Sequence, residues 1–201
     1  MTRFTPDFLD IAHEILSRYP VKKSALIPLL HLAQEQAGYV SEDAMQQIAE
    51  LVEVTPAEVL GTCSFYEMFK REPVGKYLVN ICTNISCQLL GAEELLHHAE
   101  HALKIRPGGT TDDRLFTLED VECLAACTEA PCLQVNYRYF NKVSTADFDQ
   151  LISDLRADRR DIPRHGLLGR VRQHIPADRR AGNVAPDDDA APVWIGEGAA
   201  S

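Results

Sequence analysis

The chain has 201 residues, of which 45% are hydrophobic and 25% are charged, and its formal net charge is −10 at pH 7. A chain of this length and composition can bury a core without covalent cross-links, as one or two globular domains do. The negative net charge argues against a nucleic-acid partner, which requires clustered Lys and Arg. We find no secretory signal and no apolar stretch long enough to cross a bilayer, so we expect a cytoplasmic protein.

The first part of the chain, residues 1–72, is predicted to form a bundle of helices. Apolar residues recur at helical spacing in four segments. Thr5 and Ser41 stand where N-caps are expected, and Thr55 and Glu58 have the spacing of a capping box. The fourth segment, residues 55–69, contains three aromatic residues, and we expect them to pack the helices against the next domain rather than bind a cofactor. They are Phe65, Tyr66 and Phe69.

Residues 73–157 have a mixed pattern and predict a small domain that gives the whole chain an α/β (α+β) fold class. Short apolar runs bounded by turn residues alternate with amphipathic segments, in the order strand, helix, strand, strand, strand, helix. The last two strands form a hairpin that turns near Tyr137–Tyr139. The strands are expected near residues 76–82, 114–123 and 133–143, and the helices over 91–103 and 145–157.

The last segment, residues 158–201, is rich in Pro, Gly, Ala and Arg and has few apolar residues. Such a composition cannot form a core of its own. It predicts an extended tail that binds a partner surface or stays disordered. If it binds a partner, its apolar anchors are Leu167, Leu168 and Trp194.

The six cysteines carry the chemistry of this sequence. In a cytoplasmic protein thiols remain reduced, so metal ligands or buried thiols are expected rather than disulfides. Cys82 and Cys87 follow the first strand and are separated by four residues, whereas Cys123 and Cys127 follow the second strand and are separated by three. Four thiolates suit a [2Fe-2S] cluster or a tetrahedral zinc ion, and the wide spacing favours the cluster. Unliganded core or redox thiols are the third interpretation.

Two of the six cysteines are not needed for a site with four thiolates. Cys63 lies within the fourth helical segment and is expected to be a buried core thiol. Cys132 opens the third strand, and the loop length lets either Cys127 or Cys132 pair with Cys123. We favour Cys127, because the short loop between Cys123 and Cys127 closes with less strain.

In this order, the stretches PVGKY, CTNISC, GAEELL, FTLEDVECLAAC, EAP and QVNY resemble the 24-kDa subunit family of NADH dehydrogenase, whose members are thioredoxin-like [2Fe-2S] ferredoxins. The resemblance covers residues 5–157 and includes the helical stretches SALIPLLHLAQEQAGYVS and SFYEMF. It implies a thioredoxin-like domain after the helical bundle. It also implies that the cluster ligands are Cys82, Cys87, Cys123 and Cys127.

The resemblance further implies an electron-transfer subunit of respiratory NADH:quinone oxidoreductase (complex I), peripheral on the cytoplasmic side of the cell membrane. FMN and NADH are then held by the adjacent flavoprotein subunit, and electrons pass ultimately to quinone. In agreement, the sequence has no GxGxxG motif after a strand. We therefore expect no catalytic residue in this chain and no activity when it is alone.

Two other functions remain open. The same module serves as a diaphorase subunit in soluble NAD-linked formate dehydrogenases or hydrogenases. A zinc-stabilised interaction module without a redox role belongs to a different class. The remaining histidines, among them His97, His98 and His101, are expected on a solvated helix face rather than around a metal.

One departure from the family concerns Ala125, where the family often has glycine. Because a Cβ disfavours positive φ, the loop around Ala125 is expected to use ordinary backbone dihedrals.

Overall fold

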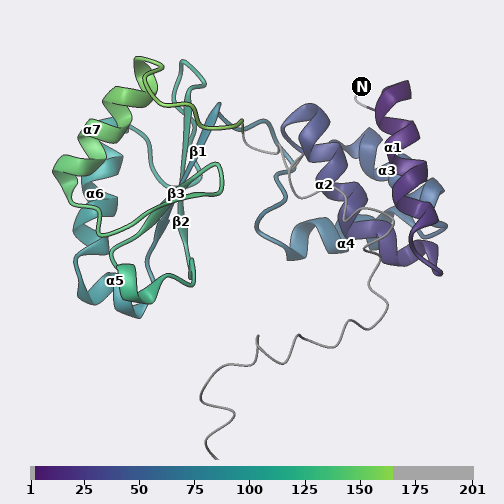
Figure 1. The fold of residues 1–201 in the computed structure, drawn as a ribbon, viewed down its shortest axis with the longest axis horizontal. Helices are drawn as coiled ribbons and strands as arrows, with labels where there is room; N and C mark the ends of the chain where they lie inside the picture. Colours follow the sequence, from purple (N-terminus) through teal and green to yellow (C-terminus); the bar gives the residue numbers. More distant parts are fainter. Residues whose placement is uncertain (1–2, 165–201) are drawn as a thin grey trace, which may run out of the picture. The chain divides into compact units, whose positions relative to one another are not determined.

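The computed structural model describes residues 3–164 (Figure 1). Along the chain, helices come first and strands alternate with helices afterwards. The elements are α1 (Pro6–Ser17), the 3-10 helix η1 (Lys22–Ala25), α2 (Leu26–Ala37), α3 (Glu42–Val52), α4 (Pro56–Phe65), β1 (Tyr77–Cys82), α5 (Ile85–Leu89), α6 (Ala92–Leu103), β2 (Phe116–Val121), the 3-10 helix η2 (Cys127–Glu129), β3 (Leu133–Val135), β4 (Arg138–Phe140) and α7 (Thr145–Arg156).

The starts of α1, α3 and α4 follow the predicted caps. Thr5 is the N-cap of α1, and the Ser41 side chain accepts a hydrogen bond from the backbone N–H of Ala44. Thr55 and Glu58 form both hydrogen bonds of a capping box at the start of α4. These helices share one hydrophobic cluster drawn from residues 4–69, which confirms the predicted helical bundle.

Helix α4 is shorter than the sequence pattern suggests, because it ends at Phe65 and the backbone turns extended at Tyr66. The predicted helical segment continued to Phe69. Phe69 is still buried in the bundle core, but it reaches that core from the connecting segment.

The four strands form one sheet in the order β2-β1-β3-β4. Strand β1 pairs with β2 in parallel and with β3 in antiparallel orientation, and β3 and β4 form the predicted hairpin. Asn136 and Tyr137 both have positive φ in its turn, as the tightest hairpins require. The Asn136 side chain also accepts a hydrogen bond from the N–H of Leu78 and donates to the carbonyl of Lys76, so it ties the hairpin to β1.

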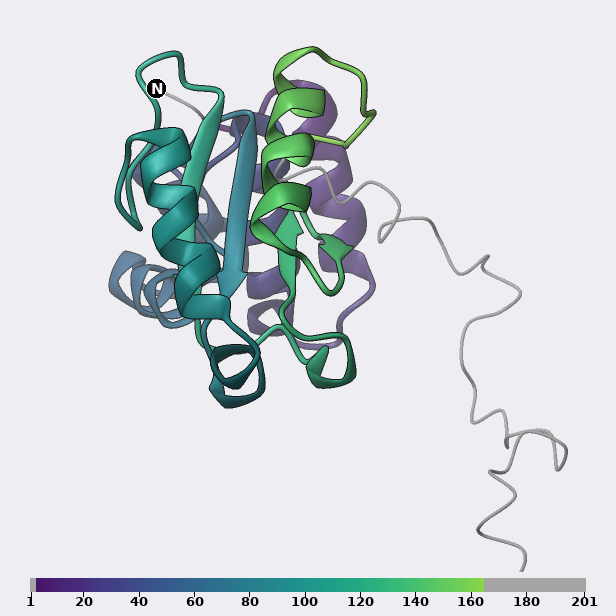
Figure 2. The ribbon, with the colours of Figure 1, turned by 90° about the vertical axis from the view of Figure 1, so that its left-hand side faces the viewer.

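Helices α6 and α7 pack side by side on one face of the sheet (Figures 1 and 2). Their apolar faces form a second hydrophobic cluster with the sheet. The predicted fold class is therefore confirmed: helices precede an α/β domain with a four-stranded sheet. The buried helix residues are Ala92, Leu95, Ala99 and Leu103 in α6, and Phe148, Leu151, Ile152 and Leu155 in α7.

The chain keeps contact with this domain just beyond α7. Ile162 is part of the second hydrophobic cluster, and the carbonyl of Pro163 accepts a hydrogen bond from the Asn136 side chain.

The tail anchors at Leu167, Leu168 and Trp194 lie outside the described residues. The domain boundaries at 72/73 and 157/158 stay a prediction. Within residues 3–164, none of the helices combines the length and apolar character needed to cross a bilayer.

Candidate metal centre

The parallel pairing of β1 and β2 brings the cysteine-bearing loops to one end of the sheet. Cys82, the last residue of β1, pairs with Val121, the last residue of β2. Because parallel strands end at the same sheet edge, the segments after both strands emerge together, and Figure 2 shows these loops below the end of β1. Cys87 lies in α5, Cys123 follows β2, and Cys127 begins η2. A helix was expected only after Cys87, but α5 already contains it.

Three cysteine sulfur atoms lie close together at the end of the sheet where β1 and β2 both finish. The Sγ atoms of Cys82, Cys87 and Cys132 all lie within 4.8 Å of one another, and the Cys87 and Cys132 sulfurs are 3.7 Å apart. All three side chains are buried, with at most 3% of their surface exposed. Cys123 and Cys127 are exposed and are not part of this group. The structure thus brings together two of the four predicted ligands and adds Cys132.

Backbone N–H groups of the two loops point at cysteine sulfurs. The amides of Leu124 and Asn84 hydrogen-bond the Cys82 sulfur, and the N–H of Ala125 donates to Cys123 Sγ over 3.3 Å. The Leu124 contact spans the two loops, since Leu124 follows β2 and Cys82 ends β1. Such donors stabilise a negatively charged thiolate.

These surroundings give the three buried thiols different acidities. Burial raises the pKa of Cys82, but the amide hydrogen bonds and the neighbouring thiols outweigh it and the pKa is lowered overall. The pKa of Cys87 is raised, chiefly by burial. Burial and the adjacent Cys87 raise the pKa of Cys132 to about 12. Cys132 is therefore a protonated thiol at neutral pH, whereas Cys82 is the most readily ionised of the three.

The backbone at Ala125 corrects one expectation. Its φ is +56°, in the left-handed region, although ordinary dihedrals were predicted for this loop. The short connection from Cys123 to Cys127 must reverse direction, and the left-handed turn at Ala125 lets its N–H reach Cys123 Sγ. This conformation costs a residue with a Cβ about 1–2 kcal/mol.

The donor set at this edge fits a [2Fe-2S] cluster. Such a cluster takes four thiolates, two on each iron. Cys82 and Cys87 offer one pair of adjacent sulfurs. Cys123 and Cys127 are two further thiols, exposed on the segment whose Leu124 amide contacts the Cys82 sulfur. The cysteines at this end of the sheet therefore include the four thiolates that a [2Fe-2S] cluster takes.

The other candidate metal-binding residues behave as expected for structural or surface groups. His97 and His98 contact single carboxylates, those of Glu100 and Asp149, at 3.1 and 2.8 Å. Among the residues that the structure describes, no group of three potential ligands forms around a histidine. Cys63 is buried in the bundle, and burial raises its pKa, which confirms its role as a core thiol.

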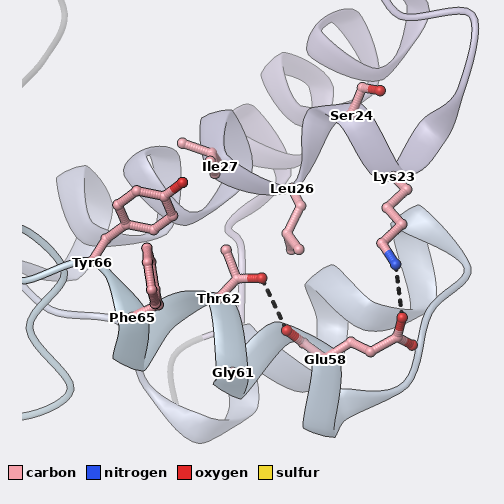
Figure 3. Close-up of a pocket in the computed structure, with 9 residues that line it drawn as sticks. All are labelled: Lys23, Ser24, Leu26, Ile27, Glu58, Gly61, Thr62, Phe65 and Tyr66. Atoms are coloured by element: carbon pink, nitrogen blue, oxygen red, sulfur yellow. Dashed lines mark hydrogen bonds and ion pairs between the residues drawn. The ribbon is translucent and has the colours of Figure 1, made fainter.

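Two of the three aromatic residues were wrongly expected to be packed. Phe69 is buried, but Phe65 is 78% exposed and Tyr66 is 37% exposed. Both rings line a groove of about 570 Å³ instead of entering the core (Figure 3). The groove lies between α4 and the η1–α2 segment, and Leu26 and Ile27 line its other side. The sequence carries no signal for it, since the same pattern would fit a longer helix.

Glu58 at the rim of this groove provides a pH-dependent term in stability. A hydrogen bond from Lys23, followed by the two from Thr55, lowers the pKa of Glu58 from 4.5 to about 2 (Figure 3). A carboxylate whose pKa is lower in the folded chain stabilises it fully above pH 4.5 and ceases to do so as pH falls towards 2. We expect Glu58→Gln to lower the free energy of unfolding at neutral pH and to lose this effect progressively over that range.

Urea unfolding of the wild type and of Glu58→Gln, measured by circular dichroism at a series of pH values, tests this expectation. A difference in the free energy of unfolding that stayed constant from pH 5 down to about pH 2 would contradict it. Lys23→Met should show the same pH trend, because it removes the partner with the largest effect on Glu58.

Comparison with known proteins identifies the family of this chain. The chain is 38% identical to NADH-quinone oxidoreductase subunit 2 of Thermus thermophilus over 86% of its own length and 96% of that protein. It is 37% identical to the E subunit of NADH-quinone oxidoreductase of Mycobacterium bovis, over 77% of its own length and 62% of that protein. A solved structure of NAD+-reducing [NiFe]-hydrogenase in the H2-reduced state resembles it with a TM-score of 0.60 and 25% identity, over 69% of this chain and 23% of that one. The family of thioredoxin-like [2Fe-2S] ferredoxins matches residues 12–156, and the chain belongs to that family.

Proposed function

We propose that this chain is the electron-transfer subunit of an NADH:quinone oxidoreductase and carries one [2Fe-2S] cluster on Cys82, Cys87, Cys123 and Cys127. Family membership supports the cluster. The relative from Thermus thermophilus supports the complex, because the match spans almost the whole of that subunit. The observation that carries the proposal is the parallel register of β1 and β2, which sets Cys82 opposite Val121 and so starts both cysteine-bearing loops at one end of the sheet.

The choice of Cys127 over Cys132 rests on position. Cys132 is buried directly before β3, where the strand fixes it. Cys127 is exposed on the same loop as Cys123, at the start of η2, so this loop can close over a cluster without disturbing β3.

The residues around the site then set its electrostatics. A bound [2Fe-2S] cluster supplies storage and transfer of one electron. The amides of Leu124, Asn84 and Ala125 donate hydrogen bonds to sulfur and stabilise negative charge there. The buried Cys82 and Cys87 keep one side of the site dry. The chain's net charge of −10 opposes the addition of an electron, so a low reduction potential is expected.

The partners in this proposal are the subunit that binds FMN and NADH and the other subunits of the hydrophilic arm. The complex is located at the cytoplasmic side of the cell membrane, with no insertion of this chain into the bilayer. No chemistry for hydride transfer is assigned to this chain, because a cluster of this kind takes up single electrons. NADH oxidation is therefore assigned to the flavoprotein partner.

A second function is favoured by one observation. The likeness to NAD+-reducing [NiFe]-hydrogenase extends over 69% of this chain, so the same module also suits the diaphorase of a soluble NAD-linked hydrogenase or formate dehydrogenase. Purification of the native complex through a tag on this chain distinguishes the two. Co-purification with membrane subunits and NADH:quinone reductase activity supports the first function, and co-purification with a hydrogenase or formate dehydrogenase subunit supports the second.

The cluster itself is tested on the purified chain under anaerobic conditions. We expect about two irons and two sulfides per chain, a red-brown colour that dithionite bleaches, and an EPR signal in the reduced state. A colourless protein with one zinc ion would instead support the zinc-stabilised interaction module.

The isolated chain with its cluster is expected to show no NADH oxidation with any artificial electron acceptor. Activity should appear after reconstitution with the flavoprotein subunit. Steady-state assays and equilibrium binding of FMN and NADH to the chain alone check this expectation, and measurable binding of either would contradict it.

A further inference from the structure

The buried thiol of Cys132 has no part in the proposed cluster, yet its sulfur lies with those of Cys82 and Cys87. All three pairs of sulfur atoms are within 4.8 Å, and the Cys87–Cys132 pair is 3.7 Å apart. Cys132 is held there by the fold: it directly precedes β3, and its carbonyl accepts a hydrogen bond from the N–H of Cys82. The three sulfurs therefore form a fixed triangle at the end of β1.

This triangle has the dimensions of a site for a single metal ion. With a metal–sulfur distance of about 2.3 Å, three thiolates around one ion lie about 4 Å from one another. A [2Fe-2S] cluster needs a different arrangement, in which two pairs of thiolates are held on two irons. Cys82, Cys87 and Cys132 thus match one ion, whereas Cys82 and Cys87 together with Cys123 and Cys127 match the cluster.

The absence of a fourth ligand selects the ion. Among residues 3–164, no other His, Cys, Asp or Glu ligand atom joins the group. Structural zinc has four protein ligands in a tetrahedron and zinc with three protein ligands keeps a fourth position open for water, whereas monovalent copper is soft and is bound by thiolates. Three sulfurs in an enclosed site therefore favour Cu(I) over Zn(II).

The surroundings suit a negatively charged copper–thiolate centre. The amides of Leu124 and Asn84 donate to the Cys82 sulfur, and the amide of Cys132 donates to the Cys87 sulfur. Ala92 and Ala130 are buried beside the three cysteines and complete an apolar shell. Such a shell excludes water from the ion.

We propose that Cys82, Cys87 and Cys132 form a second metal site, which binds one Cu(I) ion when the chain carries no cluster. Binding replaces thiol protons by the metal and releases them to solvent, with no change of oxidation state. Copper and the cluster exclude each other because both use Cys82 and Cys87. That exclusion rests on the proposed cluster ligands, whereas the copper site does not.

The test uses the full-length, reduced, cluster-free chain under anaerobic conditions, titrated with Cu(I) in competition with bicinchoninate. Native mass spectrometry gives the stoichiometry, and copper K-edge absorption spectroscopy gives the number of sulfur ligands. We expect one copper per chain bound by three sulfurs. Cys132→Ser should weaken binding by more than the roughly 10- to 100-fold that loss of an outer-shell partner costs. Cys127→Ser and Cys63→Ser, which each also remove one thiol, should retain wild-type affinity.

The same variants separate this proposal from the proposed function. Cluster reconstitution should succeed in Cys132→Ser and fail in Cys127→Ser, the reverse of their copper binding. Wild-type copper affinity in a folded Cys132→Ser or Cys132→Ala, or an equal loss in Cys127→Ser, would overturn the copper site and leave the cluster assignment standing. Failure of cluster reconstitution in the wild type, with copper binding as expected, would overturn the proposed function alone. Circular dichroism of both Cys132 variants shows whether they are folded.

Discussion

Replacement of any one of Cys82, Cys87, Cys123 or Cys127 by serine is expected to abolish the [2Fe-2S] signal or perturb it strongly. Each iron depends on two thiolates, and serine offers a much harder oxygen that rarely ionises. At Cys82 a second effect adds to this one, because two backbone amides are aimed at its sulfur. Iron and sulfide content and the EPR spectrum of each purified variant measure the effect.

The two remaining cysteines provide matched controls for these variants. Cys63→Ser and Cys132→Ser each remove one thiol as well, but the first lies in the helical core and the second is buried directly before β3, outside the proposed set of cluster ligands. Both should keep the cluster. A normal EPR signal in Cys127→Ser together with a lost signal in Cys132→Ser would reverse the ligand choice.

Phe148→Ala is expected to have the largest effect on stability. Phe148 lies on α7 and is fully buried in the hydrophobic cluster between the helices and the sheet. Its ring meets the His98 ring edge-on, with the two ring centroids 6.1 Å apart. Truncation of such a side chain costs about 3–5 kcal/mol, which is a large share of the roughly 5–15 kcal/mol that holds a typical domain folded.

Phe65→Ala makes the same chemical change at an exposed position and serves as the control. With 78% of its surface exposed, Phe65 should change the free energy of unfolding by only about 0.5 kcal/mol. Urea unfolding of both variants, followed by circular dichroism, gives the two values. Equal destabilisation would mean that Phe65 is packed in solution and that the groove beside it is closed.

The sequence was sufficient to predict most of the fold, because its local signals agree with one another. Thr55 and Glu58 define the start of α4, and the apolar faces of α6 and α7 can be read from helical spacing alone. The end of α4 could not be predicted, since nothing between Phe65 and Phe69 breaks a helix. Burial of Phe69 in the bundle core is a tertiary effect that overrides this local pattern.

At the site, the sequence identified the cysteine pairs but not how the sulfurs are arranged. Loop length suggested that Cys127 and Cys132 compete for one role, whereas the structure separates them into an exposed loop and a buried strand end. That separation depends on the pairing of β3 with β1, which brings Cys132 next to Cys82. The positive φ of Ala125 was missed for a similar reason, because the Ala125–Cys123 hydrogen bond that accompanies it forms only when the loop turns back.

The topology of the sheet has a consequence for how the chain folds during synthesis. Helices α1–α4 find all their core partners within the first 69 residues, so their contacts are local and can form early. Strand β1 lies between β2 and β3. Its pairing with β3 can form only after residue 135 has left the ribosome. Until then, one edge of β1 is unpaired beside the thiols of Cys82 and Cys87. Metal loading of this site is therefore expected only after residue 135 has emerged, which pulse labelling with radioactive iron during translation in vitro would reveal.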